Sequence, residues 1–500
     1  MILLQILSFA FLGASVDSSI SSPSPAGVVL RADFHATVGF HPASAGTEGD
    51  LGFAENYMPD WDAHRLDPEL VQRWEALPSL AQVDLSATMD SVKIFASLPL
   101  RRDIDAWRRD PTGGNLLHGV EELDINAPYE GWISWRSQRG VSLQVGRFRQ
   151  SFSPSPYGVI LGSNLIHDGA VVRVPMGRWT FDWFFSSLNP WLMGVNTFQE
   201  VAPGSETVLQ TTRTISNQRG RIYDAPSKSL FLHRLSCEVG NWELSIVEQL
   251  LVGGKAPQWR DAVPFVVWHN SFGDGYSKVS TALQATWSPP HAGRFHAQGI
   301  IEDIKMSVGE LEENDDPRTV YASNLGWSGA TRQLGGVWSA SVDASLTSAT
   351  FNNHMIPLLK GTSRRLYRSN NRLQGKPDFV DTWIVDQPLG YLRGSDAADL
   401  WTHLDWTSPD ALKGAGLELD WLNQGDAAVW MDEAQLPRRK GPLSGEVTSQ
   451  WRALAHGWGM VARRIRMDAG LGIVRTDAPA ATGRRVLVTP DLSGSLSIVF

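Results

Sequence analysis

The chain has 500 residues, enough for two or three soluble domains or for one large barrel. Its 44 basic and 53 acidic residues give a net charge of −9, which argues against a main role in nucleic-acid binding. The single cysteine, Cys237, excludes an intramolecular disulfide framework and a cysteine-based metal centre. The 21 tryptophans favour a membrane interface, although some soluble carbohydrate-binding proteins are also rich in tryptophan.

The first residues of the chain resemble an export signal. Residues 2–12 form an apolar core, and the small residues Gly13, Ala14 and Ser15 follow it. No Lys or Arg precedes the core, which departs from the usual pattern. We predict a signal peptide over residues 1–18 and an outer-membrane barrel over residues 19–500.

The next segment alternates between apolar and polar side chains. Over residues 28–40 every second residue from Val28 to Phe40 is apolar, while Arg31 and Asp33 lie on the other face. A membrane-spanning strand needs about 9–11 residues, so this segment is long enough. A soluble sandwich would give the same alternation, and therefore the repetition of the pattern must decide.

The two-residue period recurs along the whole chain. About sixteen segments alternate in this way, with turn residues between them and little helix. We therefore predict an all-β fold, namely a transmembrane antiparallel up-and-down β-barrel of about 16–18 strands with a short helical insert, in the bacterial outer membrane. The clearest segments are 83–89, 92–98, 123–135, 141–145, 179–185, 242–246, 295–302, 338–346 and 417–421.

The last ten residues form another alternating segment, with an apolar residue or glycine at every second position from Leu492 to Phe500. An aromatic residue at the end of such a strand resembles the closing strand of outer-membrane barrels, where it guides insertion. We predict that Phe500 is an insertion signature for the barrel assembly machinery. We also expect the last strand to pair with residues 28–40.

Helical signals are few. Asp67, Pro68 and Glu69 have the order of an N-cap, a first helical position and an acidic first turn, and they predict a helix within residues 61–78. This helix could be a plug, a cap or a surface decoration. Weak patterns predict long loops, extracellular in a barrel, at about 186–228, 350–385 and 424–446.

Catalytic motifs are nearly absent. The sequence contains no zinc-protease, nucleophile-elbow, phosphate-loop or dinucleotide-binding motif, and its 12 histidines are scattered. We therefore expect no enzyme, no cofactor and no metal site. An outer-membrane hydrolase remains an alternative, because a Ser and a His brought together from separate strands leave no local motif.

Residues 145–192, 233–306 and 387–406 carry a resemblance to a known family. In the first stretch a strand ends in Gly-Arg, and a Gly-containing loop, an apolar run, an Asp and an aromatic-rich strand follow. This order resembles the Wzi-type capsule assembly family, although the Ser-Pro-Ser-Pro run at 153–156 replaces an expected Gly-rich turn. The matching positions are Gly146, Arg147, Gly158, Leu161, Ser163, Asp168, Phe181, Glu248, Pro264, Asn270, Trp287, Glu302 and Asp303.

The resemblance implies a monomeric outer-membrane barrel of about eighteen strands that acts as a lectin. Such proteins attach or organise capsular polysaccharide at the cell surface, and helix and folded-in loops block their interior. The implied partners are capsular or extracellular polysaccharide and outer-membrane lipid or lipopolysaccharide. A sugar- or anion-passing porin remains an alternative, because its strands would show the same pattern.

Two groups of residues are candidates for a site. Polar residues within strand-like segments predict an ion-pair network in the lumen, because buried charges need partners. An Arg- and Asn-rich stretch in the predicted loop 350–385 suits an anionic glycan, or else it is a solvated loop or a patch for lipopolysaccharide phosphates. The lumen candidates are Arg147, Asp168, Glu248, Asn270 and Asp303, and the glycan candidates are Arg364, Arg365, Arg368 and Asn370.

Overall fold

The computed structural model describes the chain in fifteen stretches. The predicted signal peptide, Asn270, Phe500 and most of the loop at 186–228 lie outside them. The described residues are 28–40, 63–65, 68–110, 112–124, 129–162, 165–190, 227–263, 277–303, 320–333, 335–354, 357–370, 380–427, 443–462, 464–480 and 483–499.

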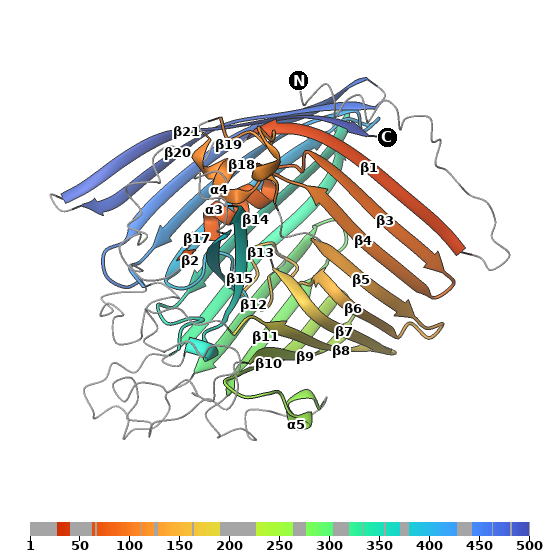
Figure 1. The fold of residues 1–500 in the computed structure, drawn as a ribbon. Coiled ribbons are helices and arrows are strands. Elements are labelled where there is room, and N and C mark those ends of the chain that lie inside the picture. Colours follow the sequence, from red (N-terminus) through yellow and green to blue (C-terminus); the bar gives the residue numbers. More distant parts are fainter. Residues whose placement is uncertain are drawn as a thin grey trace.

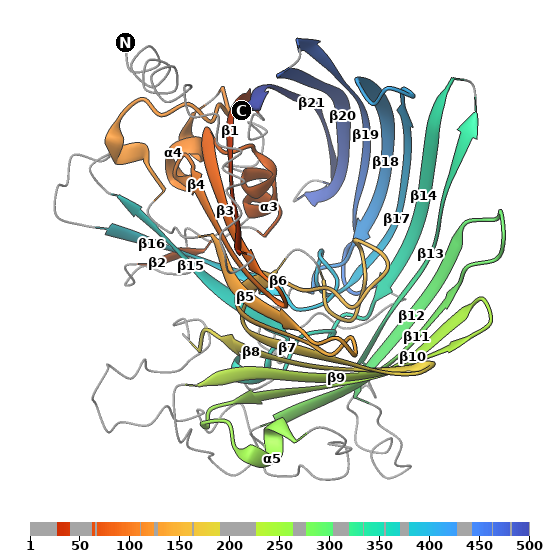
Figure 2. The same ribbon diagram turned by 90° about the vertical axis from the view of Figure 1, so that its right-hand side faces the viewer.

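An 18-stranded antiparallel sheet closes on itself and forms a barrel, which confirms the predicted fold class (Figure 2). The strands are β1 (Val28–Phe40), β3 (Ala81–Met89), β4 (Val92–Leu100), β5 (Glu130–Arg136), β6 (Ser142–Arg149), β7 (Ile166–Met176), β8 (Trp179–Leu188), β9 (Lys228–Val239), β10 (Trp242–Gly253), β11 (Ser277–Trp287), β12 (Arg294–Asp303), β13 (Val320–Gln333), β14 (Gly336–Thr347), β17 (Ala397–Thr407), β18 (Lys413–Gln424), β19 (Thr448–Ala462), β20 (Ile465–Ala480) and β21 (Gly483–Val499).

The first and last strands close the barrel, as the sequence predicts. β1 pairs with β21 from His35 opposite Val499 to Phe40 opposite Gly494, and it pairs with β3 along its other edge. Because closure leaves no unpaired sheet edge, every strand can satisfy its backbone groups within the wall.

The wall is apolar outside and polar inside. Leu404, Leu417, Leu471 and Leu492 lie along one row of paired positions, and each is 38–66% exposed on the outer face. The neighbouring row, which points inward, carries polar side chains such as Asp405. This alternation is typical of a strand with lipid on one side and a polar lumen on the other.

Tight hairpins gather at one end of the barrel, and long connections gather at the other (Figure 1). Asp90, Gly177 and Gly240 adopt positive φ values of 45°, 68° and 61° in two-residue turns, which lets the strands reverse without splaying. Short turns are periplasmic and long loops extracellular in barrels of this kind. We therefore call the two ends periplasmic and extracellular.

A small subdomain lies at the extracellular end. The helix expected within residues 61–78 is α3 (Pro68–Ala76), and α4 (Ile104–Arg109) packs near it. A three-stranded sheet of β15 (Thr362–Asn370), β16 (Val380–Pro388) and β2 (Ala63–Arg65) completes the surface subdomain. Much of the loop expected at 350–385 is therefore a hairpin, because β15 and β16 pair along their whole length.

The remaining helical elements are short. They are η2 (Val120–Glu122), α5 (Trp259–Ala262) and η6 (Pro357–Leu359). Among the described residues, no helix has both the length and the apolar character that a membrane span requires.

Candidate functional site

A segment between β6 and β7 folds into the barrel. We call residues 150–162 the plug segment; it contains the Ser-Pro-Ser-Pro run, and Figure 2 shows it within the ring of strands. The backbone N–H groups of Ser153, Ser155 and Tyr157 each donate to the serine hydroxyl two residues earlier, at 2.9–3.1 Å. The two prolines between them have no N–H group to satisfy. The serine side chains therefore satisfy the backbone N–H groups of the run, so these groups need no partner on a neighbouring strand.

Hydrogen bonds fix the plug segment to the wall. Gln298 Oε1 on β12 accepts from Ser153 Oγ at 3.0 Å and from the Val159 N–H at 3.2 Å. Gln249 Nε2 on β10 donates to the Ile160 carbonyl at 3.0 Å. Because Gln249 and Gln298 are buried, these amides satisfy plug backbone groups that no water reaches.

Apolar contacts add to this attachment. Val159, Ile160 and Leu161 are at most 1% exposed. They belong to the main hydrophobic cluster, together with inward-facing wall residues such as Val247 and Ile300. Burying a side chain of this size contributes about 1.5–3 kcal/mol, so the plug segment is a packed part of the fold.

A second inner segment, residues 388–396, lies against the plug segment. The Gly162 N–H donates to the Leu389 carbonyl at 3.2 Å. Arg393 pairs with Asp420 on β18, and Arg393 also lies over the ring of Tyr157, 5.9 Å from its centroid. Trp401 on β17 also packs against Tyr157, with 5.2 Å between the two ring centroids. Wall and inner segments thus share one aromatic and ionic cluster.

The surface subdomain is centred on Glu75 of α3. The Glu75 carboxylate accepts from the Tyr129 hydroxyl at 2.6 Å and from Arg365 Nη1 at 2.7 Å, and it lies 3.6 Å from Arg149 Nη2. Burial opposes ionisation of Glu75, but Arg365, Arg149 and Tyr129 outweigh it and hold the Glu75 pKa below its usual value. Burial and the negative Glu75 raise the pKa of Tyr129 to about 12. The carboxylate is the counter-ion that joins α3 to β15.

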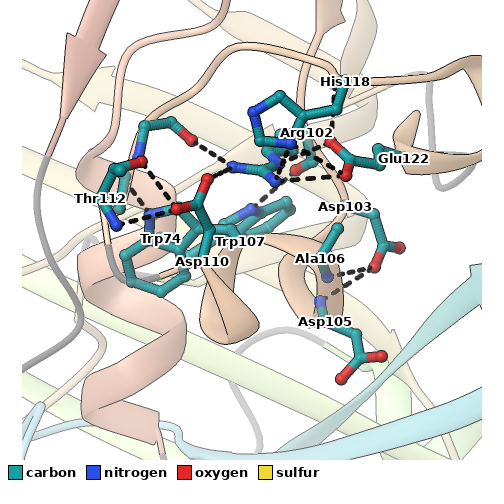
Figure 3. A network of polar contacts seen from close by, with 12 residues as sticks. Trp74, Arg102, Asp103, Asp105, Ala106, Trp107, Asp110, Thr112, His118 and Glu122 are labelled. Atoms are coloured by element: carbon teal, nitrogen blue, oxygen red, sulfur yellow. Dashed lines mark hydrogen bonds and ion pairs between the residues drawn. The ribbon is translucent and has the colours of Figure 1, made fainter. Parts of the chain in front are cut away.

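Arg102 holds the segment around α4 (Figure 3). Its guanidinium is 3% exposed and pairs with Glu122 and Asp110, while Trp74 Nε1 donates to its carbonyl at 2.9 Å. Burial opposes ionisation of Asp110, but hydrogen bonds from Arg102 and Thr112 lower the Asp110 pKa to about 2. This network is a support for the extracellular end.

Two of the predicted lumen residues form one ion pair on the outer face. Arg147 Nε and Nη2 donate to the two oxygens of Asp168 at 2.7 and 2.8 Å. Arg147 shares its face with the exposed Leu143 and Val145, whereas Phe148 on the opposite face packs in the plug cluster. The pair therefore points away from the lumen, unlike the network expected from the sequence.

Glu248 also lies on the outer face. It pairs with His233 at 2.8 Å, and it alternates with the inward Val247 and Gln249. Asp303 ends β12, and its side chain lies outside the described side chains, as does all of Asn270. Any role of these two residues in the lumen stays a prediction.

Ion-pair rows do occur in the lumen, with other members. Asp182 is fully buried on β8, and its oxygens lie 2.6 Å from Arg173 and 3.7 Å from Arg234 on the two flanking strands. Arg452 on β19 bridges Glu418 and Asp491 at 3.1 and 2.8 Å. The sequence alone did not single out these residues, because each partner comes from a different strand.

The predicted glycan residues lie on β15. Arg364 donates twice to buried Asp386 on β16, at 2.6 and 2.8 Å, and Arg365 binds Glu75. Arg364 is buried and both residues hold the hairpin, which differs from the exposed loop expected. Arg368 and Asn370 lie toward the tip of the β15–β16 hairpin, and nothing further is described of their side chains. Glycan binding by these residues stays a prediction.

Comparison with solved structures finds similar barrels. Wzi, an outer-membrane protein involved in group 1 capsule assembly in Escherichia coli and a carbohydrate-binding β-barrel, matches with a TM-score of 0.50 and 12% identity, over 94% of this chain and 85% of Wzi. OccK3 (OpdO) of Pseudomonas aeruginosa matches with a TM-score of 0.41 and 10% identity, over 94% and 95% of the two chains. OpdQ of the same organism has a TM-score of 0.40 and 8% identity, over 94% and 98%.

Sequence comparison adds nothing to this result, since no family model and no curated protein matches the chain. At such low identity the structural likeness concerns the fold. A closed antiparallel barrel of 18 strands with an apolar outer band is the architecture of the bacterial outer membrane. This protein is an outer-membrane β-barrel that resembles Wzi in fold.

Proposed function

We propose that the protein binds capsular or extracellular polysaccharide at the cell surface and holds it to the outer membrane, as a monomer. The observation that carries the proposal is the plug segment, which hydrogen-bonds to wall glutamines on β10 and β12. A segment packed inside the lumen should restrict the diffusion of solutes, whereas binding at the extracellular end needs no open lumen.

The ligand class rests on the likeness in fold. Wzi is a carbohydrate-binding barrel, and the proposal extends this class of ligand to the present chain. Lipopolysaccharide surrounds any protein in the outer leaflet, so we propose it as the second partner, and the barrel assembly machinery as the partner during insertion.

The tip of the β15–β16 hairpin is the proposed contact. The hairpin is rigid at its root, because Lys228 Nζ donates to the carbonyls of Lys360 and Thr362 at 2.8 and 2.7 Å. Arg364 and Arg365 fix its middle. Arg368 and Asn370 occupy the far end of β15, and we propose them as the contact because arginine and asparagine are residue types that suit an anionic glycan.

Binding of polysaccharide from the producing strain to the purified protein tests the proposal. We expect wild type to bind and the double variant R368A/N370A to bind about tenfold or more weakly, since a hydrogen bond to a charged group contributes about 1.5–3 kcal/mol. R484A is the matched control, because Arg484 is an exposed arginine at the same end of the barrel. Absence of binding by wild type would contradict the proposed function. Equal binding by wild type and R368A/N370A would contradict only the proposal that Arg368 and Asn370 contact the polysaccharide.

A further inference from the structure

A glycine lets two polar side chains meet across three strands of the lumen wall. Asp405 on β17, Gly416 on β18 and His456 on β19 are register neighbours. Strands two apart are separated by about 9.6 Å, too far for most side chains to pair directly. Because Gly416 has no side chain, His456 Nε2 reaches to 3.1 Å from Asp405 Oδ1. A Cβ at position 416 would lie 2.2 Å from Asp405 Oδ1 and 2.6 Å from His456 Nε2.

A second imidazole joins this pair. His403 lies two residues before Asp405 on the same face of β17, and its Nε2 is 3.2 Å from Asp405 Oδ2. The His403 and His456 rings stack with centroids 5.7 Å apart. One ligand atom from each of the three residues lies within 4.8 Å of the others. Two imidazole nitrogens and the Asp405 carboxylate therefore lie together on the lumen face of the wall.

The cluster is open to the lumen. Its three side chains are 27–33% exposed. Leu404, between His403 and Asp405, points to the outer face. Trp401, two residues before His403, stacks on the His403 ring and also contacts Tyr157 of the plug segment. The ligand atoms are thus accessible to an ion from the lumen side and shielded from lipid.

A second row of the same construction provides an internal comparison. His296 on β12 and Asp343 on β14 meet over Gly326 on β13, with 2.9 Å between His296 Nε2 and Asp343 Oδ1. There the third group is the Asn324 amide, and the histidine and aspartate side chains are each 3% exposed. The His296, Asn324 and Asp343 side chains are therefore buried and hydrogen-bonded to one another. In the exposed cluster the second imidazole, His403, takes the place of the Asn324 amide.

We propose that His403, Asp405 and His456 bind a divalent transition-metal ion, with water in the remaining positions. Ligand atoms around tetrahedral zinc lie about 3.3 Å apart for metal–ligand bonds of about 2.0–2.1 Å. The two imidazoles lie at a similar spacing from the carboxylate, His403 at 3.2 Å from Oδ2 and His456 at 3.1 Å from Oδ1. Imidazole with carboxylate suits zinc, nickel or copper better than magnesium or calcium. Binding requires each Nε2 to present its lone pair, so the ring proton moves to Nδ1. The ion would tie β17 to β19 beneath the plug segment.

Calorimetric titration of zinc chloride into the detergent-purified, untagged full chain tests this site. We expect one zinc per chain and no binding of magnesium. H403Q and D405N should each weaken zinc binding about tenfold or more, while H296Q, in the buried row, should leave it unchanged. H403Q keeps the Asp405–His456 pair, and the heat-dependent gel mobility of the barrel checks its fold. No zinc binding by wild type, or equal affinity of H403Q and wild type, would overturn the proposal.

Discussion

Gln298 on β12 and Val159 in the plug segment are joined by a 3.2 Å hydrogen bond, although 139 residues separate them in the chain. The same amide oxygen accepts from Ser153. One wall side chain therefore satisfies two donors of a segment that crosses the interior.

Removing this side chain should loosen the plug. In Q298A the Val159 N–H and the Ser153 hydroxyl lose their partner, which costs about 1–3 kcal/mol per buried group. We expect Q298A to conduct ions in planar bilayers more often than wild type. Q450A is the matched control, since Gln450 donates to Thr476 on the neighbouring strand. Equal conductance of Q298A and Q450A would show that the hydrogen bonds do not hold the plug.

The ion pair inside the β15–β16 hairpin should be far more important than its exposed counterpart. Arg364 and Asp386 are 8% and 6% exposed, so R364A leaves a buried carboxylate without this partner and costs about 3–5 kcal/mol. R147A removes a pair of similar geometry whose side chains are 41% and 54% exposed, and it should cost at most about 1 kcal/mol. Urea denaturation monitored by the tryptophan fluorescence of the whole protein measures both. A similar loss in the two variants would contradict the assigned burial.

The surface subdomain should weaken in acid because of Glu75. Its folded-state pKa is lowered, so the unfolded state binds more protons as the pH falls. The stabilisation is full well above the free carboxyl pKa of about 4.3, and it is lost as the pH falls through the lower folded value. Hydrogen exchange of α3 amides should accelerate over this window in wild type and change less in E75Q. If α3 amide exchange accelerated equally in wild type and E75Q as the pH fell, a group other than Glu75 would be responsible.

A charged residue on the lipid-facing surface of the wall should destabilise the barrel. Leu471 on β20 is 66% exposed on the lipid side, and an arginine near the middle of the membrane costs about 2–4 kcal/mol. L471R should therefore unfold from lipid vesicles at lower guanidinium concentration than L471A. If the two variants unfolded together, this row would not face lipid.

The barrel could be predicted from the sequence because each wall strand shows a local pattern, the alternation of apolar and polar residues. Alternation over 28–40 and 492–500 reports two faces, and closure then leaves β1 and β21 to pair. The sequence did not show whether Arg147 and Glu248 point into the lumen or to the outer face of the barrel. A polar residue in a strand favours the lumen, yet near the extracellular end each finds a partner on the outer face.

The interior could not be predicted in the same way. The Ser-Pro-Ser-Pro run gave no sign that it would enter the lumen, because its anchors Gln249 and Gln298 lie far along the chain. His456 and Asp405 are likewise 51 residues apart, so their spacing matches no metal motif. Such sites arise from strand register, which a single sequence does not display.

Deletion of the gene, with the cell-bound and released polysaccharide measured separately, tests whether the protein holds polysaccharide at the cell surface. We expect total polysaccharide to be unchanged and the cell-bound fraction to fall, and we expect the wild-type gene, but not R368A/N370A, to restore the cell-bound fraction. An unchanged cell-bound fraction in the deletion strain would contradict a role in surface attachment and leave only the barrel itself.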